Sequence, residues 1–142
     1  MKLVKHLLDR KGRHIVSIAP DASVFDAIKL MAEKAVGSLL VMDDEELRGI
    51  VTERDYARKV IIKGRSSEST AVSEIMTTNI VSTTSAETVN HCMEMMSSQG
   101  VRHLPVVEDN RVIGMLSMRD LVQAIIADQQ EEIEQLEHYI SG

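Results

Sequence analysis

One short motif occurs twice in the sequence and combines a hydroxyl, a basic and an acidic side chain. Residues 49–55 read Gly-Ile-Val-Thr-Glu-Arg-Asp, and residues 114–120 read Gly-Met-Leu-Ser-Met-Arg-Asp. A hydroxyl that caps a helix, together with the free N–H groups of the first turn, can hold a phosphate oxygen. A carboxylate one turn later only accepts hydrogen bonds, so it can bind the two neighbouring hydroxyls of a ribose. The residues that would do this chemistry are Thr52, Asp55, Ser117 and Asp120.

The second copy also carries two basic residues that the first copy lacks. Arg102 and His103 stand where the first copy has Gly37 and Ser38. A guanidinium can bind phosphate oxygens through two hydrogen bonds, and a protonated imidazole can donate to them. The basic pair therefore favours an anion, whereas the small residues of the first copy leave room.

Each of these features also has a purely structural explanation. A hydroxyl followed three residues later by an acid can form a capping box that only stabilises the helix start. Arg102 and His103 can form surface ion pairs with the acidic turn at residues 108–110. The recurrence of Gly, hydroxyl, Arg and Asp in both copies favours ligand binding over a simple cap.

These motifs belong to an internal repeat of the chain. When the sequence is shifted by 65 residues, residues 15–61 align with residues 80–126 without a gap, and 13 of the 47 pairs are identical. Residues 4–8 resemble residues 72–76 with a three-residue difference in spacing. The basic N-terminal segment is therefore interpreted as the lead-in of the first repeat rather than as a targeting peptide.

Each repeat is predicted to fold as strand, helix, strand, strand, helix. In the first copy a β-rich stretch (His14–Ile18) precedes a helix that Asp21 or Ser23 would cap and whose apolar residues recur every three or four positions. A hairpin of two strands, Ser38–Met42 and Leu47–Val51, then leads to a second helix capped by Thr52. The corresponding features of the second copy are Ser85 as a cap, a helix over Val89–Met96, strands at His103–Val107 and Val112–Leu116, and Ser117 as the second cap.

This pattern predicts an α/β (α+β) fold of two repeats packed about a pseudo-twofold axis. The expected bounds are 4–63 for repeat one, 64–71 for a linker, 72–127 for repeat two and 128–142 for a helical extension. A unit of about 60 residues buries little apolar surface alone, so the repeats should form one domain with two unequal clefts at their seam. In the extension, Ile126, Ile133, Leu136 and Ile140 approximate a heptad pattern interrupted by Gln129, so we expect an interaction helix for its own or a neighbouring subunit rather than a foreign partner.

The composition excludes several classes of protein. A net charge of -6 and 2% aromatic residues disfavour nucleic-acid binding. The longest apolar runs are shorter than the roughly 18 residues that a membrane span requires. The single cysteine, Cys92, cannot form an internal disulfide and is expected in the core, which indicates a reducing compartment, taken as the cytoplasm. No His or Cys spacing predicts a metal site.

The repeated unit resembles the CBS domain, named after cystathionine β-synthase. The resemblance rests on the motifs at 49–55 and 114–120 and on His-Leu-Pro-Val-Val at 103–107, and it covers roughly residues 4–127. The chain is similar to stand-alone bacterial CBS pairs, and residues 51–59 also resemble small plant organellar CBS-pair proteins. Such a pair, or Bateman module, implies a regulatory protein that binds AMP, ADP, ATP, NAD(H) or S-adenosylmethionine between its repeats and commonly forms a homodimer.

The resemblance also implies roles for individual residues. Asp55 and Asp120 would bind ribose, Thr52 and Ser117 ribose or phosphate, and Arg102 and His103 phosphate, while Arg54 and Arg119 occupy a position that varies in the family. The basic pair favours an anionic nucleotide over the sulfonium of S-adenosylmethionine. The adenine pocket beside Asp120 would be lined by His14, Ile15, Val16, Val36, Gly37, Ser38 and Met115, and the one beside Asp55 by Ile50, Asn79, Ile80, Val81 and Val101.

Two alternative functions remain open. A scaffold that dimerises without a ligand shares the packing features but does not need the two aspartates. A nucleotide-hydrolysing enzyme is disfavoured because the sequence has no phosphate loop, no dinucleotide fingerprint and no nucleophile with a visible base. We therefore expect no catalytic residues, and the regulated activity would belong to an unidentified partner protein.

Overall fold

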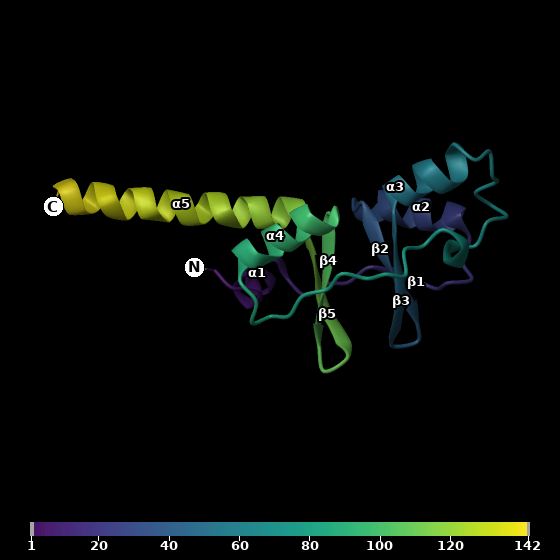
Figure 1. The fold of residues 1–142 in the computed structure, drawn as a ribbon, viewed down its shortest axis with the longest axis horizontal. Coiled ribbons are helices and arrows are strands. Elements are labelled where there is room, and N and C mark those ends of the chain that lie inside the picture. Colours follow the sequence, from purple (N-terminus) through teal and green to yellow (C-terminus); the bar gives the residue numbers. More distant parts are fainter. Residues whose placement is uncertain (1, 142) are drawn as a thin grey trace. The chain divides into compact units, whose positions relative to one another are not determined.

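A computed structural model describes residues 2–141, which form the mixed α/β fold predicted from the sequence (Figure 1). The chain divides into two compact units: unit 1 comprises Met1–His14 and Val81–Gly142, and unit 2 comprises Ile15–Ile80. Each unit contains most of one sequence repeat and the segment that leads into the other repeat. The compact units and the sequence repeats therefore divide the chain at different places.

Unit 2 contains a three-stranded sheet of order β1-β2-β3, in which β1 runs parallel and β3 antiparallel to β2. Ser23 caps α2, because its side chain accepts a hydrogen bond from the backbone N–H of Asp26 at 3.1 Å. The buried face of α2 packs with the sheet in one hydrophobic core. The elements are β1 (Ser17–Ile18), α2 (Val24–Lys34), β2 (Ser38–Asp43), β3 (Glu46–Thr52), α3 (Glu53–Tyr56), the π-helical turn η1 (Ala57–Ile61) and the 3-10 turn η2 (Val72–Glu74).

Unit 1 contains the antiparallel hairpin β4–β5, with its own hydrophobic core. The expected first strand of the second repeat is reduced to an isolated parallel bridge between Thr83 and Val106. The prediction that Ser85 caps the next helix is wrong: Thr88 accepts from the backbone N–H of His91 at 3.1 Å, while Ser85 bonds Glu108. The elements are α1 (Val4–Lys11), α4 (Val89–Gln99), β4 (His103–Glu108), β5 (Arg111–Ser117) and α5 (Met118–Ser141).

The repeated glycines of the two motifs let the lead-in segments approach the hairpins closely. A Cβ atom on Gly114 would lie 2.6 Å from Cδ2 of Leu8 in α1, and one on Gly49 would lie 2.8 Å from the Met76 sulfur. Both distances are shorter than an ordinary carbon contact of about 3.5–4.0 Å. The two glycines therefore serve the packing of the lead-in segments.

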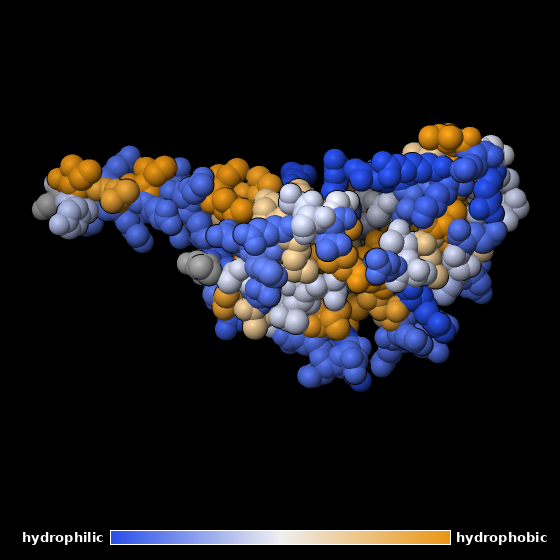
Figure 2. All heavy atoms as spheres, in the orientation of Figure 1, coloured by the Kyte–Doolittle hydropathy of each residue, from blue (hydrophilic) through white to orange (hydrophobic). Residues whose placement is uncertain are grey.

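Helix α5 begins at the end of β5 and extends beyond the rest of unit 1 (Figure 1). Its buried residues, Leu121 and Ala124, lie in the first two turns, whereas every residue from 129 to 141 is exposed. Large apolar side chains remain on this exposed part, including Ile133, Leu136 and Ile140. Figure 2 shows hydrophobic groups along this helix.

Candidate functional site

In unit 2 the predicted acid–hydroxyl pair forms where β3 passes directly into α3. The Thr52 side chain accepts a hydrogen bond from the backbone N–H of Asp55 at 3.1 Å. Oδ2 of Asp55 in turn accepts from the backbone N–H of Thr52 at 3.0 Å and from its hydroxyl at 3.1 Å. The Asp55 side chain is only 12% exposed, so this reciprocal cap holds a nearly buried carboxylate at the helix start.

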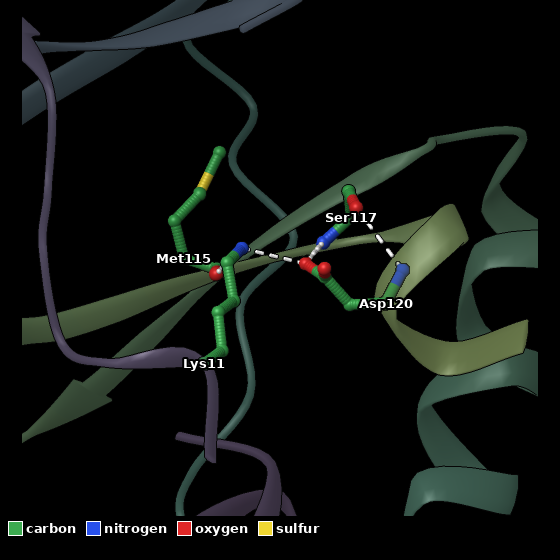
Figure 3. Close-up of polar contacts among 4 residues, drawn as sticks. All are labelled: Lys11, Met115, Ser117 and Asp120. Carbon is green, nitrogen blue, oxygen red and sulfur yellow. Dashed lines mark hydrogen bonds and ion pairs between the residues drawn. The ribbon is translucent and has the colours of Figure 1, made fainter. Parts of the chain in front are cut away.

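Unit 1 builds the same pair where β5 passes into α5 (Figure 3). Oδ2 of Asp120 accepts from the backbone N–H of Ser117 at 2.8 Å, and the Ser117 hydroxyl accepts from the backbone N–H of Asp120 at 3.2 Å. The Asp120 side chain is 20% exposed. The capping explanation is thus correct for both pairs, because each hydroxyl and each carboxylate takes part in a hydrogen bond of the cap.

A lysine that the sequence analysis missed lies against each of the two carboxylates. The Lys11 ammonium donates to Oδ2 of Asp120 at 2.6 Å and to the backbone carbonyl of Met115 at 2.7 Å, as Figure 3 shows. In unit 2 the Lys59 ammonium lies 3.1 Å from Oδ1 of Asp55 and donates to the backbone carbonyl of Ile75 at 2.8 Å. Each candidate half-site therefore contains a carboxylate, a capping hydroxyl and an ammonium group.

The two lysines differ in how readily the sequence could have revealed them. Lys59 follows Asp55 by four residues, the spacing at which side chains on one helix face meet, so this ion pair had a local signal. Lys11 is 109 residues from Asp120 and belongs to a segment that precedes the other repeat. No local pattern could have paired these two residues.

The charges of unit 1 shift two pKa values at this site. Burial of Asp120 opposes ionisation, but the hydrogen bonds from Lys11 and from the Ser117 N–H lower the pKa of the carboxyl below its usual 3.8. Burial and the positive charge of Lys11 lower the pKa of His103 below 6.5, although Asp120 acts in the opposite direction. His103 is therefore mostly uncharged near pH 7, and Lys11 and Arg102 supply the positive charge of this half-site.

The hairpins bring the other predicted residues to the same helix starts. The backbone N–H of Met118 donates to the carbonyl of Arg102 at 2.8 Å, and His103 pairs with Ser117 in the β4–β5 register. Arg102 is exposed and His103 is half-buried. In unit 2 Gly37 and Ser38 take the equivalent places, where the Glu53 N–H donates to Gly37 at 3.1 Å and Ser38 pairs with Thr52.

The remaining predicted residues are distributed over both units. Arg54 and Arg119, one residue before each aspartate, are exposed. Each predicted adenine pocket combines residues of unit 1 with residues of unit 2, so both pockets stay predictions. Those in unit 1 are His14, Val81, Val101 and Met115, and those in unit 2 are Ile15, Val16, Val36, Gly37, Ser38, Ile50, Asn79 and Ile80.

Other chemistry finds little support in residues 2–141. No group of three or more His, Cys, Asp or Glu side chains in this range could hold a metal ion. Cys92 is fully buried in the core of unit 1, and burial raises the pKa of its thiol. Within the same range, no helix has the length and apolar character needed to cross a membrane.

Comparison with known proteins identifies the family of this chain and several relatives. A family model described as CBS domain matches residues 4–62 and again residues 72–127. The chain is 42% identical over 127 residues to the CBS domain-containing protein CBSX3, mitochondrial, of Arabidopsis thaliana; the match covers 86% of this chain but only 62% of the plant protein.

Two solved structures extend the comparison to the fold. A putative signal-transduction protein with CBS domains from Burkholderia ambifaria MC40-6 is 45% identical with a TM-score of 0.87, and the match covers 90% of this chain and 96% of that one. The CBS domain pair of protein MJ0100, solved in complex with 5′-methylthioadenosine and S-adenosyl-L-methionine, is 26% identical with a TM-score of 0.80, covering 90% and 98%. Both ligands contain an adenosine group.

Proposed function

The chain belongs to the CBS-domain family, and we propose that it is a sensor that binds an adenosine-containing nucleotide: AMP, ADP, ATP or NAD(H). The observation that carries this proposal is the acid–hydroxyl pair at the start of α3 and of α5, which recurs with the same hydrogen bonds in both units. An ionised carboxylate held at a helix start is suited to a ribose diol. The adenosine ligands of MJ0100 support the same class of ligand.

Positive charge near Asp120 favours an anionic nucleotide. Lys11 and Arg102 lie at this half-site, and the exposed guanidinium of Arg102 can bind phosphate oxygens in a bidentate manner. The sulfonium of S-adenosylmethionine would meet unfavourable charge at the same place. His103 adds positive charge only at a pH below its lowered pKa, so it contributes little to phosphate binding at neutral pH.

The proposed role is regulatory rather than catalytic. A ligand that prefers one conformation shifts the population of the protein toward it, and this shift can be read by a partner. We place the regulated activity in another protein. We also place the chain in the cytoplasm, a reducing compartment that suits its single free cysteine, Cys92.

A homodimer in which α5 takes part completes the proposal. Helix α5 exposes Val122, Ile126, Ile133, Leu136 and Ile140 at a/d-type spacing, and a second copy offers the same stripe. Antiparallel pairing centred on residue 131 would place apolar residues opposite each other, with Gln129 opposite Ile133.

Titration calorimetry with AMP, ATP, NADH and S-adenosylmethionine tests the sensor function. The wild-type protein should bind at least one of the three anionic nucleotides, and Asp120→Asn should weaken that binding at least tenfold. The matched control is Asp109→Asn, which removes an exposed charge at the tip of the β4–β5 hairpin and should leave binding unchanged. No response to any of the four compounds would favour the ligand-free dimerisation scaffold. Turnover of ATP or NADH would favour the enzyme.

A further inference from the structure

The carboxylate of Asp120 keeps one oxygen free of protein donors. The hydrogen bonds from the Lys11 ammonium and from the Ser117 N–H both end on Oδ2. Within residues 2–141, Oδ1 accepts no hydrogen bond. Each carboxylate oxygen offers about two acceptor positions, so both positions of Oδ1 remain for a ligand. Two is the number that a vicinal diol requires.

The carboxylate of Asp55 is more fully engaged. Oδ2 accepts two hydrogen bonds from Thr52, one from its N–H and one from its hydroxyl, and Oδ1 faces the Lys59 ammonium at 3.1 Å. About one acceptor position therefore remains. A diol can bind here through both hydroxyls only after one protein donor has moved. Lys59 is the donor that can move most easily, because its side chain is 43% exposed.

The two lysines do not occupy equivalent positions of the repeat. At the 65-residue spacing, Lys59 aligns with Ala124, and in the alignment of the lead-in segments Lys11 corresponds to Asn79. Lys59 lies on the same helical segment as Asp55, four residues later, so it competes with a ligand for Oδ1 of Asp55. Lys11 comes from α1 and leaves Oδ1 of Asp120 open, with one of its three N–H donors uncommitted to Asp120 or Met115.

We propose that the two half-sites fill in a fixed order, the Asp120 half-site first, and that Lys59 delays ligand binding at the Asp55 half-site by occupying Oδ1. Lys11, in contrast, assists ligand binding: its remaining N–H donates to a ligand oxygen beside Asp120. This inference rests on the proposed function, because it concerns the binding of the same class of nucleotide.

Calorimetric titration of the full chain with AMP tests the order. The first binding event should be lost in Asp120→Asn and kept in Asp55→Asn. Loss of the first event in Asp55→Asn, with Asp120→Asn unaffected, would overturn the inference. If the wild-type protein bound none of AMP, ATP and NADH, the proposed function itself would fail, which is a different result from binding in the wrong order.

The role of each lysine is tested with adenosine, which carries the diol but no phosphate. Lys59→Met should strengthen binding at the Asp55 half-site about tenfold, the value of one hydrogen bond to a charged acceptor. Lys11→Met should weaken binding at the Asp120 half-site. Lys63→Met, an exposed lysine four residues beyond Lys59, is the charge-matched control and should change neither. Unchanged or weaker binding in Lys59→Met would contradict the role assigned to Lys59.

Discussion

Replacing Gly114 by alanine should destabilise unit 1 through a single contact with α1. The new Cβ would lie 2.6 Å from Cδ2 and 3.3 Å from Cδ1 of Leu8, so the leucine must withdraw by about 1 Å to reach ordinary contact distance. Leu8 is fully buried, so the surrounding core of unit 1 must absorb any shift of its side chain. Gly114 does not have a positive φ, so alanine fits the backbone and the contact alone decides the outcome.

Overpacking of a buried position costs about 1–3 kcal/mol. For a chain of this size, a loss of about 2 kcal/mol corresponds to a fall in Tm of roughly 4–8 °C. The free energy of unfolding is to be measured by urea denaturation for Gly114→Ala, with thermal melting as a second reading.

A double-mutant cycle separates this contact from a general effect of the substitution. Leu8→Val removes the two Cδ atoms that the new Cβ would meet, so Gly114→Ala should cost at least 1 kcal/mol less in that background. An equal cost of Gly114→Ala in both backgrounds would refute the claim that Gly114 exists to admit α1.

Three further predictions concern charge, capping and assembly. The pKa of Asp120 is lowered on folding, so its contribution to stability is complete above about pH 4 and is lost as the pH falls through the lowered value. In urea denaturation, Lys11→Met should therefore lower the free energy of unfolding by up to about 1 kcal/mol at pH 6 and by little at pH 2. An equal loss at the two pH values would contradict this account. Thr88→Ala should cost about 1 kcal/mol through loss of the α4 cap, whereas Ser85→Ala should cost less, and the reverse order would restore Ser85 as the cap. Leu136→Glu should halve the mass measured by light scattering if α5 pairs with a second copy, and an unchanged mass would exclude that pairing.

Local features of the fold were predictable from the sequence because they depend on neighbouring residues. The hairpins, the caps at Ser23 and Thr52 and the continuation of α5 all follow from short-range patterns. The first strand of the second repeat was predicted too long. Residues 80–83 have a β-rich composition, but in this segment only Thr83 pairs with the hairpin, through an isolated bridge to Val106.

Features that depend on distant pairing were not predictable. The packing of α1 in unit 1 brings Lys11 to Asp120 across 109 residues, and a periodicity within one repeat contains no information about this exchange. The acids and hydroxyls of the candidate site were found because their spacing is local. The ammonium groups that set the charge of the site were missed, although Lys59 had an i,i+4 signal.

The central claim is that the carboxylate at a helix start binds a ribose diol. It is tested most directly by comparing AMP with its 2′,3′-dideoxy analogue in calorimetric titrations of the wild-type protein and of Asp120→Asn. The wild-type protein should bind AMP about tenfold to a hundredfold more tightly than the analogue, because the analogue cannot donate two hydrogen bonds to a charged acceptor. In Asp120→Asn this difference should largely disappear. Equal affinity of the wild-type protein for both compounds, or a difference that persists in Asp120→Asn, would contradict the account.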